Sequence, residues 1–381
     1  MINSHRFSIP IATLPHIWCL LQSALVRQSS GRLWCSRGQK AFFFRGSAWG
    51  ISEAIKTLLK SKKKIKGIIF LPEYFCNQAL MPLRPQPVQL VFYPITKDLN
   101  PDWSLMNSLV SRYGSPDIFI LVHYFGFPGE ITKTIQFCQQ VEAKFLEDCA
   151  HVLLPFDDIG KHGWATIFSP YKLLPVPKLG ILVVSEKMEI SQEIFGKRKR
   201  VDINMYKWIG KRLAQSFLAS CNIPWRSGKA VPFELDAEVK LEENYSISVW
   251  ILQLLKILES ELERYKTIRR KYYKIIEEQI SSINSMVARP LFPFLPDSVC
   301  PYLFPICLNE EIIEKVYYLL NGMGIPAQTW PDLPPEVKEN PSQHEIALKL
   351  RRSVLTLPIH QSLTKDQIEY IGRSLREAIL K

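Results

Sequence analysis

Two stretches of the chain, Phe145-Leu-Glu-Asp-Cys-Ala-His151 and Ala165-Thr-Ile-Phe-Ser-Pro-Tyr-Lys-Leu-Leu-Pro-Val-Pro177, decide the fold that we expect. Each begins as an apolar strand and leads to a polar side chain, Asp148 in the first stretch and Lys172 in the second. Ligands of open α/β sheets lie beyond the carboxyl ends of the strands, so this acid and this amine are predicted to meet at one site. A lysine that forms a Schiff base and a carboxylate that pairs with a pyridinium nitrogen are what pyridoxal phosphate (PLP) needs. The pair therefore predicts a PLP site with Lys172 and Asp148 as its catalytic residues.

Three residues of this region have second interpretations. Lys178 is a rival for the Schiff base, although it lies six residues further on, close to the next apolar run. Asp148 could instead cap a following helix, which is a common role of aspartate. His151 is either a core histidine or a residue that orients Asp148 or contacts the hydroxyl group of the cofactor.

Between residues 40 and 185 apolar runs alternate with helical patterns, which is typical of an α/β sheet. The near-continuous apolar character of the runs favours strands that are buried on both faces. The expected strands are 67–71, 88–93, 117–122, 144–147, 165–168 and 180–184, and the expected helices are 47–59, 77–83 and 130–143.

The chain changes character after this segment. Residues 187–230 are basic and irregular, and we interpret them as a surface excursion or as a lid over the site. Residues 243–280 have the spacing of one or two amphipathic helices. The elements expected beyond them are a strand at 302–308, a helix at 310–323, a Pro-rich loop at 328–335, a strand at 355–359 and a last helix that begins at Thr364. We therefore expect a large α/β domain with an N-terminal arm over residues 1–240 and a small α+β domain over residues 241–381.

Composition excludes several classes of protein. The 381 residues are 47% hydrophobic, which suffices for a large core. No run approaches the roughly 20 apolar residues of a membrane span. The nearest run, residues 9–26, is interrupted by prolines and is expected to form a short helix that opens near Thr13. The eight cysteines have the spacing of neither a zinc site nor a disulfide framework, which favours a reduced, cytoplasmic compartment.

The net charge of +12 is accompanied by short basic runs at residues 60–66 and 197–200. Such a charge can attract polyanions, among them a nucleotide diphosphate. The runs carry no aromatic ladder and match no nucleic-acid-binding motif. We therefore interpret them as solvated faces and expect no nucleic-acid partner.

The segment from Ser169 to Pro177 resembles the lysine segment of DegT/DnrJ/StrS-type aminotransferases, one branch of which carries Ser-x-x-Lys-x-Leu-Pro-Val-Pro before a glycine pair. Six further motifs are similar to motifs of this family and occur in the family's order. They are Phe44-Arg-Gly-Ser-Ala48, Leu71-Pro-Glu-Tyr-Phe-Cys76, Val122-His-Tyr-Phe-Gly-Phe-Pro128, Glu147-Asp-Cys-Ala-His151, Asn244-Tyr245 and Leu357-Pro-Ile-His-Gln-Ser-Leu-Thr364. The resemblance covers roughly residues 35 to 375, which is nearly the whole chain.

The resemblance implies several cofactor-binding residues. Gly46 and Ser47 open a helix whose N-terminal N–H groups suit the cofactor phosphate. Ser169 belongs to the lysine motif, and Asn244 aligns with an asparagine that reaches the phosphate from the partner subunit. The arginine that follows this asparagine in the family is replaced here by Ser246.

The side chain that covers the cofactor ring is left open by the sequence. Cys76 stands where many relatives place an aromatic residue that stacks on the ring, and Tyr74 or His123 could cover the ring instead. Two more positions differ from the family, with Trp164 in place of an aspartate and Leu179 in place of the first glycine of a pair. These differences indicate a divergent branch.

The resemblance further implies a PLP enzyme of fold type I, with a mixed, mostly parallel seven-stranded sheet and a smaller C-terminal α+β domain. It implies a homodimer with sites at the interface, an amino-acid donor such as glutamate, and a keto-sugar attached to a nucleotide as the acceptor. Dehydratase relatives carry a histidine in place of the lysine, so Lys172 disfavours that branch. Two alternatives remain: a PLP enzyme that acts on a non-sugar ketone, and a catalytically silent PLP-binding protein.

Overall fold

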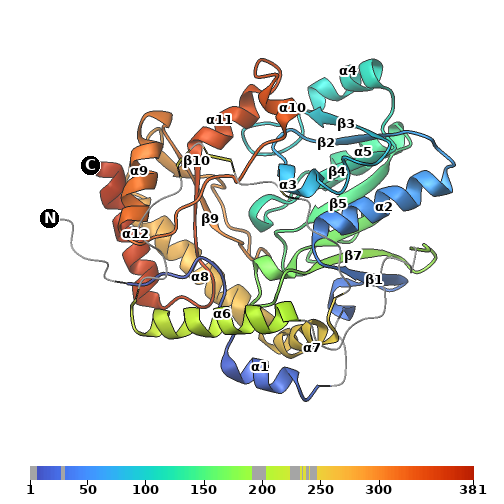
Figure 1. The fold of residues 1–381 in the computed structure, drawn as a ribbon. Coiled ribbons are helices and arrows are strands. Elements are labelled where there is room, and N and C mark those ends of the chain that lie inside the picture. The colour runs from blue at the N-terminus through green and yellow to red at the C-terminus, as the bar shows by residue number, and fades with distance from the viewer. Residues whose placement is uncertain are drawn as a thin grey trace.

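A seven-stranded mixed sheet forms the centre of the larger part of the molecule (Figure 1). The computed structural model describes residues 7–26, 31–190, 203–223, 232–233, 235–236, 240 and 247–381. The strands are β1 (Gln39–Phe44), β2 (Gly67–Pro72), β3 (Val88–Tyr93), β4 (Ile118–Val122), β5 (Lys144–Cys149), β6 (Ala165–Phe168) and β7 (Gly180–Ser185). Their order is β1-β7-β6-β5-β4-β2-β3. Strands β2 to β6 run parallel, whereas β7 is antiparallel to β6 and β1 is antiparallel to β7. The predicted fold class and the mostly parallel sheet are confirmed.

Strand β1 is the one strand of this sheet that the sequence patterns miss. It lies at the edge of the sheet, and its first four residues are only half-buried. An edge strand that opens with Gln39 and Lys40 lacks the continuous apolar run by which a strand buried on both faces is recognised. Its pairing with β7 is a long-range contact that local pattern does not encode.

Helices cover this sheet. They are α2 (Ser47–Ser61), α3 (Asn77–Leu80), α4 (Trp103–Tyr113) and α5 (Ile131–Gln140), with the short 3-10 helix η1 (Arg32–Trp34) before β1. Helix α2 packs against β1, β6 and β7, and α5 packs against β4 and β5. Helix α4 was not predicted; it begins after Asp102, whose carboxylate accepts a hydrogen bond from the N–H of Ser104.

The C-terminal part of the chain builds a second, three-stranded antiparallel sheet with its own helices (Figure 1). Its strands are β8 (Ala288–Pro290), β9 (Phe304–Leu308) and β10 (Val354–Leu357), in the order β10-β9-β8. The helices are α7 (Val249–Leu258), η5 (Glu259–Glu261), α8 (Leu262–Ile280), α9 (Glu310–Gly322), α10 (Pro335–Lys338), α11 (Glu345–Ser353) and α12 (Lys365–Leu380). The predicted amphipathic region is thus two helices, and the last helix begins after Thr364, which forms a capping box with Gln367.

The prediction that residues 187–230 are irregular is wrong for residues 203–220, which form helix α6 (Ile203–Ser220). Lys207 and Lys211 are four residues apart and both exposed, so the basic residues of this segment form the polar face of the helix. Residues 191–202 and 224–231, on which the lid interpretation also depends, lie outside the described residues.

The N-terminal segment lies against the C-terminal end of the chain. Pro10 accepts a hydrogen bond from Nε2 of His360 at 2.9 Å, and Leu14 exchanges two hydrogen bonds with Ser362. Helix α1 (Ile17–Ser23) follows, a few residues later than predicted, and packs against α7. Among the described residues, none of the helices has the length and apolar character needed to cross a membrane.

A buried guanidinium joins the two parts of the molecule. Arg269 on α8 is 1% exposed, and its Nη2 donates to the carbonyl of Leu173 at 3.0 Å. Its Nη1 donates to the carbonyl of Tyr302 at 2.8 Å, and its Nε to Oε1 of Gln361 at 2.9 Å. A buried charge needs such a complete set of acceptors, so this arginine links α8 to the segment after Lys172 and to the loop before β9.

Replacing Arg269 by methionine should therefore destabilise the fold. We expect the free energy of unfolding to fall by about 3 kcal/mol, because buried carbonyl groups lose their donors. Urea denaturation followed by tryptophan fluorescence measures this change. The control is Arg264→Met on the same helix: its side chain is 71% exposed and pairs with Glu261 at the surface, so a change below about 0.5 kcal/mol is expected. Equal losses in the two variants would contradict the role given to Arg269.

Candidate active site

The two catalytic candidates lie at the carboxyl ends of neighbouring strands. Asp148 is the penultimate residue of β5, and Lys172 ends the short 3-10 helix η3 (Pro170–Lys172) that follows β6. The two strands are parallel, with Asp148 opposite Ile167, so both side chains approach the same edge of the sheet. His151 follows β5 and places its Nε2 2.9 Å from Nζ of Lys172. The structure thus brings together the acid, the amine and the histidine that the sequence singled out.

These residues line a cavity of about 1060 Å³. Its wall is built by the start of α2, the segment around α3, the ends of the central strands and loops of the C-terminal part. The lining includes Gly46, Ser47, Tyr74, Cys76, Asp148, His151, Lys172, Lys178, Tyr302, Trp330 and Asp332. A cavity of this size accommodates a cofactor together with a substrate.

The protonation state of His151 follows from its two neighbours. The backbone N–H of Phe125 donates to Nδ1 of His151 at 3.1 Å, so Nδ1 carries no proton. Burial, the largest cause, lowers the pKa of His151 well below its ordinary value, so the ring is neutral. Its single proton is therefore on Nε2, which faces Lys172. An ammonium group has no lone pair to accept this proton, so the contact requires Lys172 to be a free amine.

The electrostatics of Lys172 agree with this assignment. Burial lowers the pKa of the Lys172 amine, and the charge of Lys178 acts in the same direction. Asp148 and Cys76 oppose the change without reversing it. Lowering the pKa of a lysine raises the share of its uncharged, nucleophilic amine at any given pH.

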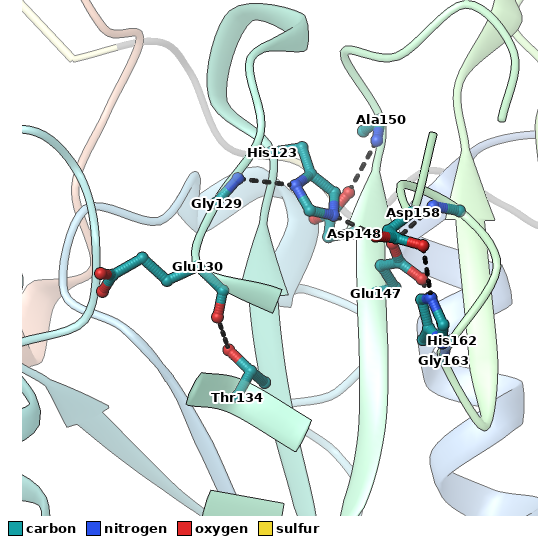
Figure 2. Close-up of polar contacts among 11 residues, drawn as sticks. His123, Gly129, Glu130, Thr134, Glu147, Asp148, Ala150, Asp158, His162 and Gly163 are labelled. Atoms are coloured by element: carbon teal, nitrogen blue, oxygen red, sulfur yellow. Dashed lines mark hydrogen bonds and ion pairs between the residues drawn. The ribbon is translucent and has the colours of Figure 1, made fainter. Parts of the chain in front are cut away.

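Asp148 is buried at the end of β5 with 6% of its surface exposed. Burial raises the pKa of its carboxyl group, whereas the hydrogen bond from the N–H of Ala150 acts in the opposite direction. The hydrogen bond from Ala150 to Oδ1 is 2.9 Å long and is drawn in Figure 2. It leaves the other carboxylate oxygen available for a ligand.

His123 does not lie on the cavity wall. Its Nε2 is 3.1 Å from Oε1 of Glu147, and its Nδ1 accepts a hydrogen bond from the N–H of Gly129 at 3.0 Å (Figure 2). Glu147 in turn accepts from the N–H groups of Gly160 and Gly163. The side chain of His123 is fully buried and both ring nitrogens have partners, so the interpretation that it covers the cofactor ring is not supported.

Cys76 lines the cavity directly before α3. Burial raises the pKa of its thiol to about 12, and the nearby carboxylate of Asp332 adds to this effect. Asp332 also accepts hydrogen bonds from the N–H groups of Asn77 and Gln78, both at 3.1 Å. The carboxylate thereby fastens the loop of residues 328–335 to the N-terminus of α3. Whether Cys76 stacks on a ring stays a prediction.

The remaining predicted residues differ in their placement. Gly46 and Ser47 lie on the cavity wall at the start of α2. Ser169 is fully buried outside the lining, and among the described residues its hydroxyl group has no hydrogen-bond partner. Asn244 and Ser246 lie outside the described residues.

Several lining residues were missed by the analysis of the sequence. The ring of His151 stacks on Tyr302, with centroids 4.9 Å apart, and Nζ of Lys172 lies 5.9 Å from the Tyr302 ring centroid. Trp330 packs against Tyr74 with centroids 4.5 Å apart. Trp330 belongs to the predicted Pro-rich loop, but no local signal indicated that this loop turns toward the sheet edge.

Comparison with known proteins bears on the fold. No protein-family model and no curated protein matches this sequence. Among solved structures, the chain is similar to Helicobacter pylori PseC, an aminotransferase involved in the biosynthesis of pseudoaminic acid (TM-score 0.66, 17% identity, 99% of this chain and 100% of that chain). It is also similar to the Escherichia coli GDP-4-keto-6-deoxy-D-mannose-3-dehydratase with bound hydrated PLP (0.68, 16%, 97% and 100%). A third similar structure is a DegT/DnrJ/EryC1/StrS aminotransferase from Brucella abortus (0.63, 13%, 96% and 96%).

These similarities extend over nearly the whole of each chain. At 13 to 17% identity they establish the fold, which is that of the PLP-dependent transferases. The fold predicted from the motif resemblance is thereby confirmed.

The assignment of a free amine to Lys172 leads to a pH-dependent prediction. In His151→Gln, the amide oxygen can accept a hydrogen bond from a charged ammonium, so the protonated form of Lys172 gains a partner. The pKa of Lys172 should then rise by about one pH unit, which shifts its reaction with acetic anhydride to higher pH. Mass spectrometry of the acetylated peptide between about pH 6 and about pH 10 gives the midpoint.

The matched control is His162→Gln, because His162 is partly exposed and lies outside the cavity lining. Its midpoint for Lys172 should equal that of the unmodified protein. An unchanged midpoint in His151→Gln would show that the imidazole does not determine the charge of Lys172.

Proposed function

We propose that this protein is a PLP-dependent aminotransferase that moves an amino group from an amino acid such as glutamate to a nucleotide-linked keto-sugar. The observation that carries the proposal is the group of Lys172, His151 and Asp148 in one cavity at the carboxyl ends of β5 and β6. A free lysine amine beside a buried carboxylate is the arrangement that this cofactor requires.

The residues present fit PLP. Lys172 would hold the cofactor aldehyde, and the free carboxylate oxygen of Asp148 would pair with the ring nitrogen. The N-terminus of α2 at Gly46 and Ser47 would bind the phosphate, since Gly46 places no capping side chain over the first N–H groups of the helix. Gly180 permits this geometry, because a Cβ there would lie 2.4 Å from the backbone nitrogen of Ser47.

The bound cofactor supplies an electron sink that stabilises negative charge on the substrate carbon. The protein supplies the proton transfers. As a free amine, Lys172 would take a proton from the substrate and return it as a general acid and base. His151 keeps this amine oriented through its Nε2, and the stacked ring of Tyr302 keeps His151 in place. Asp148 would keep the ring nitrogen protonated.

The substrate class is inferred from similar proteins and from charge. PseC serves the biosynthesis of pseudoaminic acid, and the dehydratase from Escherichia coli is named for a GDP-linked keto-sugar. The net charge of +12 suits an anionic nucleotide-linked substrate. An aminotransferase is favoured over a dehydratase, because the dehydratases of the family that this chain resembles carry a histidine where this chain has Lys172.

The decisive test is the half-reaction with the amino donor. Protein loaded with PLP should show the absorbance of a lysine-bound cofactor, and glutamate should convert it to pyridoxamine phosphate with release of 2-oxoglutarate. In Lys172→Ala the conversion should be slower by about 10³-fold or more, because both the covalent link and the proton carrier are lost. Lys161→Ala, an exposed lysine outside the cavity lining, is the control.

Each result separates the candidate functions. Conversion by another amino acid alone would replace glutamate as the donor, and no conversion by any donor would support a silent cofactor-binding protein. Absence of a lysine-bound cofactor would overturn the whole proposal. A panel of nucleotide-linked keto-sugars and simple ketones then distinguishes the two classes of acceptor.

We also infer a homodimer. Ile17, Trp18 and Leu21 on α1 and Leu25 just after it are between 54% and 83% exposed, a concentration of apolar side chains that a second subunit could cover. Sedimentation velocity should give a dimer, and the double variant Trp18→Glu/Leu21→Glu should shift it toward monomer at micromolar concentration. The control Leu105→Glu changes another exposed apolar residue, on α4, and should remain dimeric. A monomeric unmodified protein would contradict this inference.

We make two further proposals, on the domain division and on the cellular location. The chain would divide near residue 240 into a large and a small domain, which is supported by the two separate sheets within residues 39–185 and 288–357. A cytoplasmic location is supported by the eight cysteines, all of which are free thiols.

A further inference from the structure

We propose that Lys178 is a phosphate-binding residue of this site and that, together with the N-terminus of α2, it holds the phosphate group of the cofactor. This inference depends on the proposed function and adds to it a residue that neither the motif resemblance nor the comparisons assign.

The position of Lys178 is defined by its contact with α2. A Cβ atom built on Gly46 would lie 3.2 Å from Cε of Lys178. The end of the lysine side chain therefore passes over the N-cap of the helix, in the space that any larger residue at position 46 would occupy. Both Gly46 and Lys178 line the same cavity.

The backbone next to Lys178 reinforces this placement. Gly180, two residues further on, begins β7 and lies so close to α2 that a Cβ would come within 2.4 Å of the carbonyl carbon of Gly46. Leu179 between them is fully buried in the core. The segment from Lys178 to Gly180 is thus held against the first turn of α2 by packing on both sides.

Lys178 places an amine at the start of α2, where an anionic ligand would lie. Among the described lining residues the lysines are Lys172 and Lys178, the acids are Asp148, Asp236 and Asp332, and there is no arginine. Two amines in one cavity repel each other when both are charged, and the charge of Lys178 lowers the pKa of Lys172. A phosphate dianion at the start of α2 would interact favourably with Lys178 and with the helix N–H groups, while Lys172 remains a free amine.

A phosphate group could come from the cofactor or from a nucleotide diphosphate. We assign the cofactor phosphate because Lys178 lies at Gly46, at the helix end nearest to β7, and acts electrostatically on the lysine that would hold the cofactor. A ligand whose aldehyde reaches Lys172 and whose phosphate reaches Gly46 connects both ends of this arrangement.

The experiment compares two cofactors that differ only in the phosphate group. Dissociation constants of PLP and of pyridoxal are measured by absorbance titration of the apoprotein. In Lys178→Met the affinity for PLP should fall about 10- to 100-fold, and the affinity for pyridoxal should change less than about twofold. Lys178→Arg should retain most of the preference for PLP, because the charge is kept. Lys161→Met, an exposed lysine outside the cavity, should behave like the unmodified protein.

A second readout needs no cofactor. Removing the charge of Lys178 should make protonation of Lys172 easier, so the pKa of Lys172 should rise in the Lys178→Met apoprotein. The pH dependence of acetylation at Lys172 measures this shift. The affinity for pyridoxal controls for folding, because a poorly folded Lys178→Met protein would bind pyridoxal weakly as well.

Two results would overturn the inference. An equal loss of affinity for PLP and for pyridoxal would indicate a structural role. An intact preference for PLP, combined with weaker binding of uridine diphosphate to the loaded protein, would assign Lys178 to the substrate instead. Failure of the proposed function looks different, because the unmodified protein would then form no lysine-bound cofactor with either compound.

Discussion

The cavity depends on the buried guanidinium of Arg269. It extends from α8 to the carbonyl of Leu173, directly after the candidate Schiff-base lysine, and to the carbonyl of Tyr302, whose ring supports His151. Gln361 donates to the same Leu173 carbonyl at 2.9 Å. Acceptors from three distant segments are thus oriented around one charge, which cannot be buried without them: backbone carbonyls from two segments and the side-chain oxygen of Gln361. The part of the wall that carries Lys172 and the part that carries Tyr302 are therefore held in register.

Inside the cavity the chemistry rests on opposite effects of burial on an acid and a base. Burial raises the pKa of Asp148 and lowers that of Lys172, so each group is moved toward its neutral form. Specific contacts then decide the outcome: the N–H of Ala150 favours a charged Asp148, and the tautomer of His151 favours an uncharged Lys172. Pairs of groups with divergent environments are characteristic of acid–base sites.

The structure also explains how the chain accommodates the positions at which it differs from the motifs that it resembles. Leu179, in place of a glycine, fills the core, while Gly180 retains the close approach to α2. Trp164 donates its backbone N–H to Phe145 and so keeps the entry into β6 beside β5, although its side chain differs. A fold shared at 13 to 17% identity depends on such compatible packing rather than on identical residues.

Local patterns in the sequence determined many of the strands, helices and site residues of this protein. The apolar runs of the central strands, the polar residues at their ends and the amphipathic helices follow from the sequence, because each is encoded within a few neighbouring residues. Asp148 and Lys172 were found in this way, whereas the phosphate site at Gly46 followed from the motif resemblance. The edge strand β1 was missed because its pairing partner lies far along the chain.

Only the tertiary structure decided the rest of the site. In the structure His123 lies outside the cavity, because its ring pairs with Glu147. Trp330 and Asp332 line the cavity wall, although the sequence does not indicate where their Pro-rich loop lies relative to the sheet. The tertiary structure also placed Lys178 over Gly46. The physical reason is the same in each case: a side chain's partner is set by packing between distant segments, and no local periodicity records that packing.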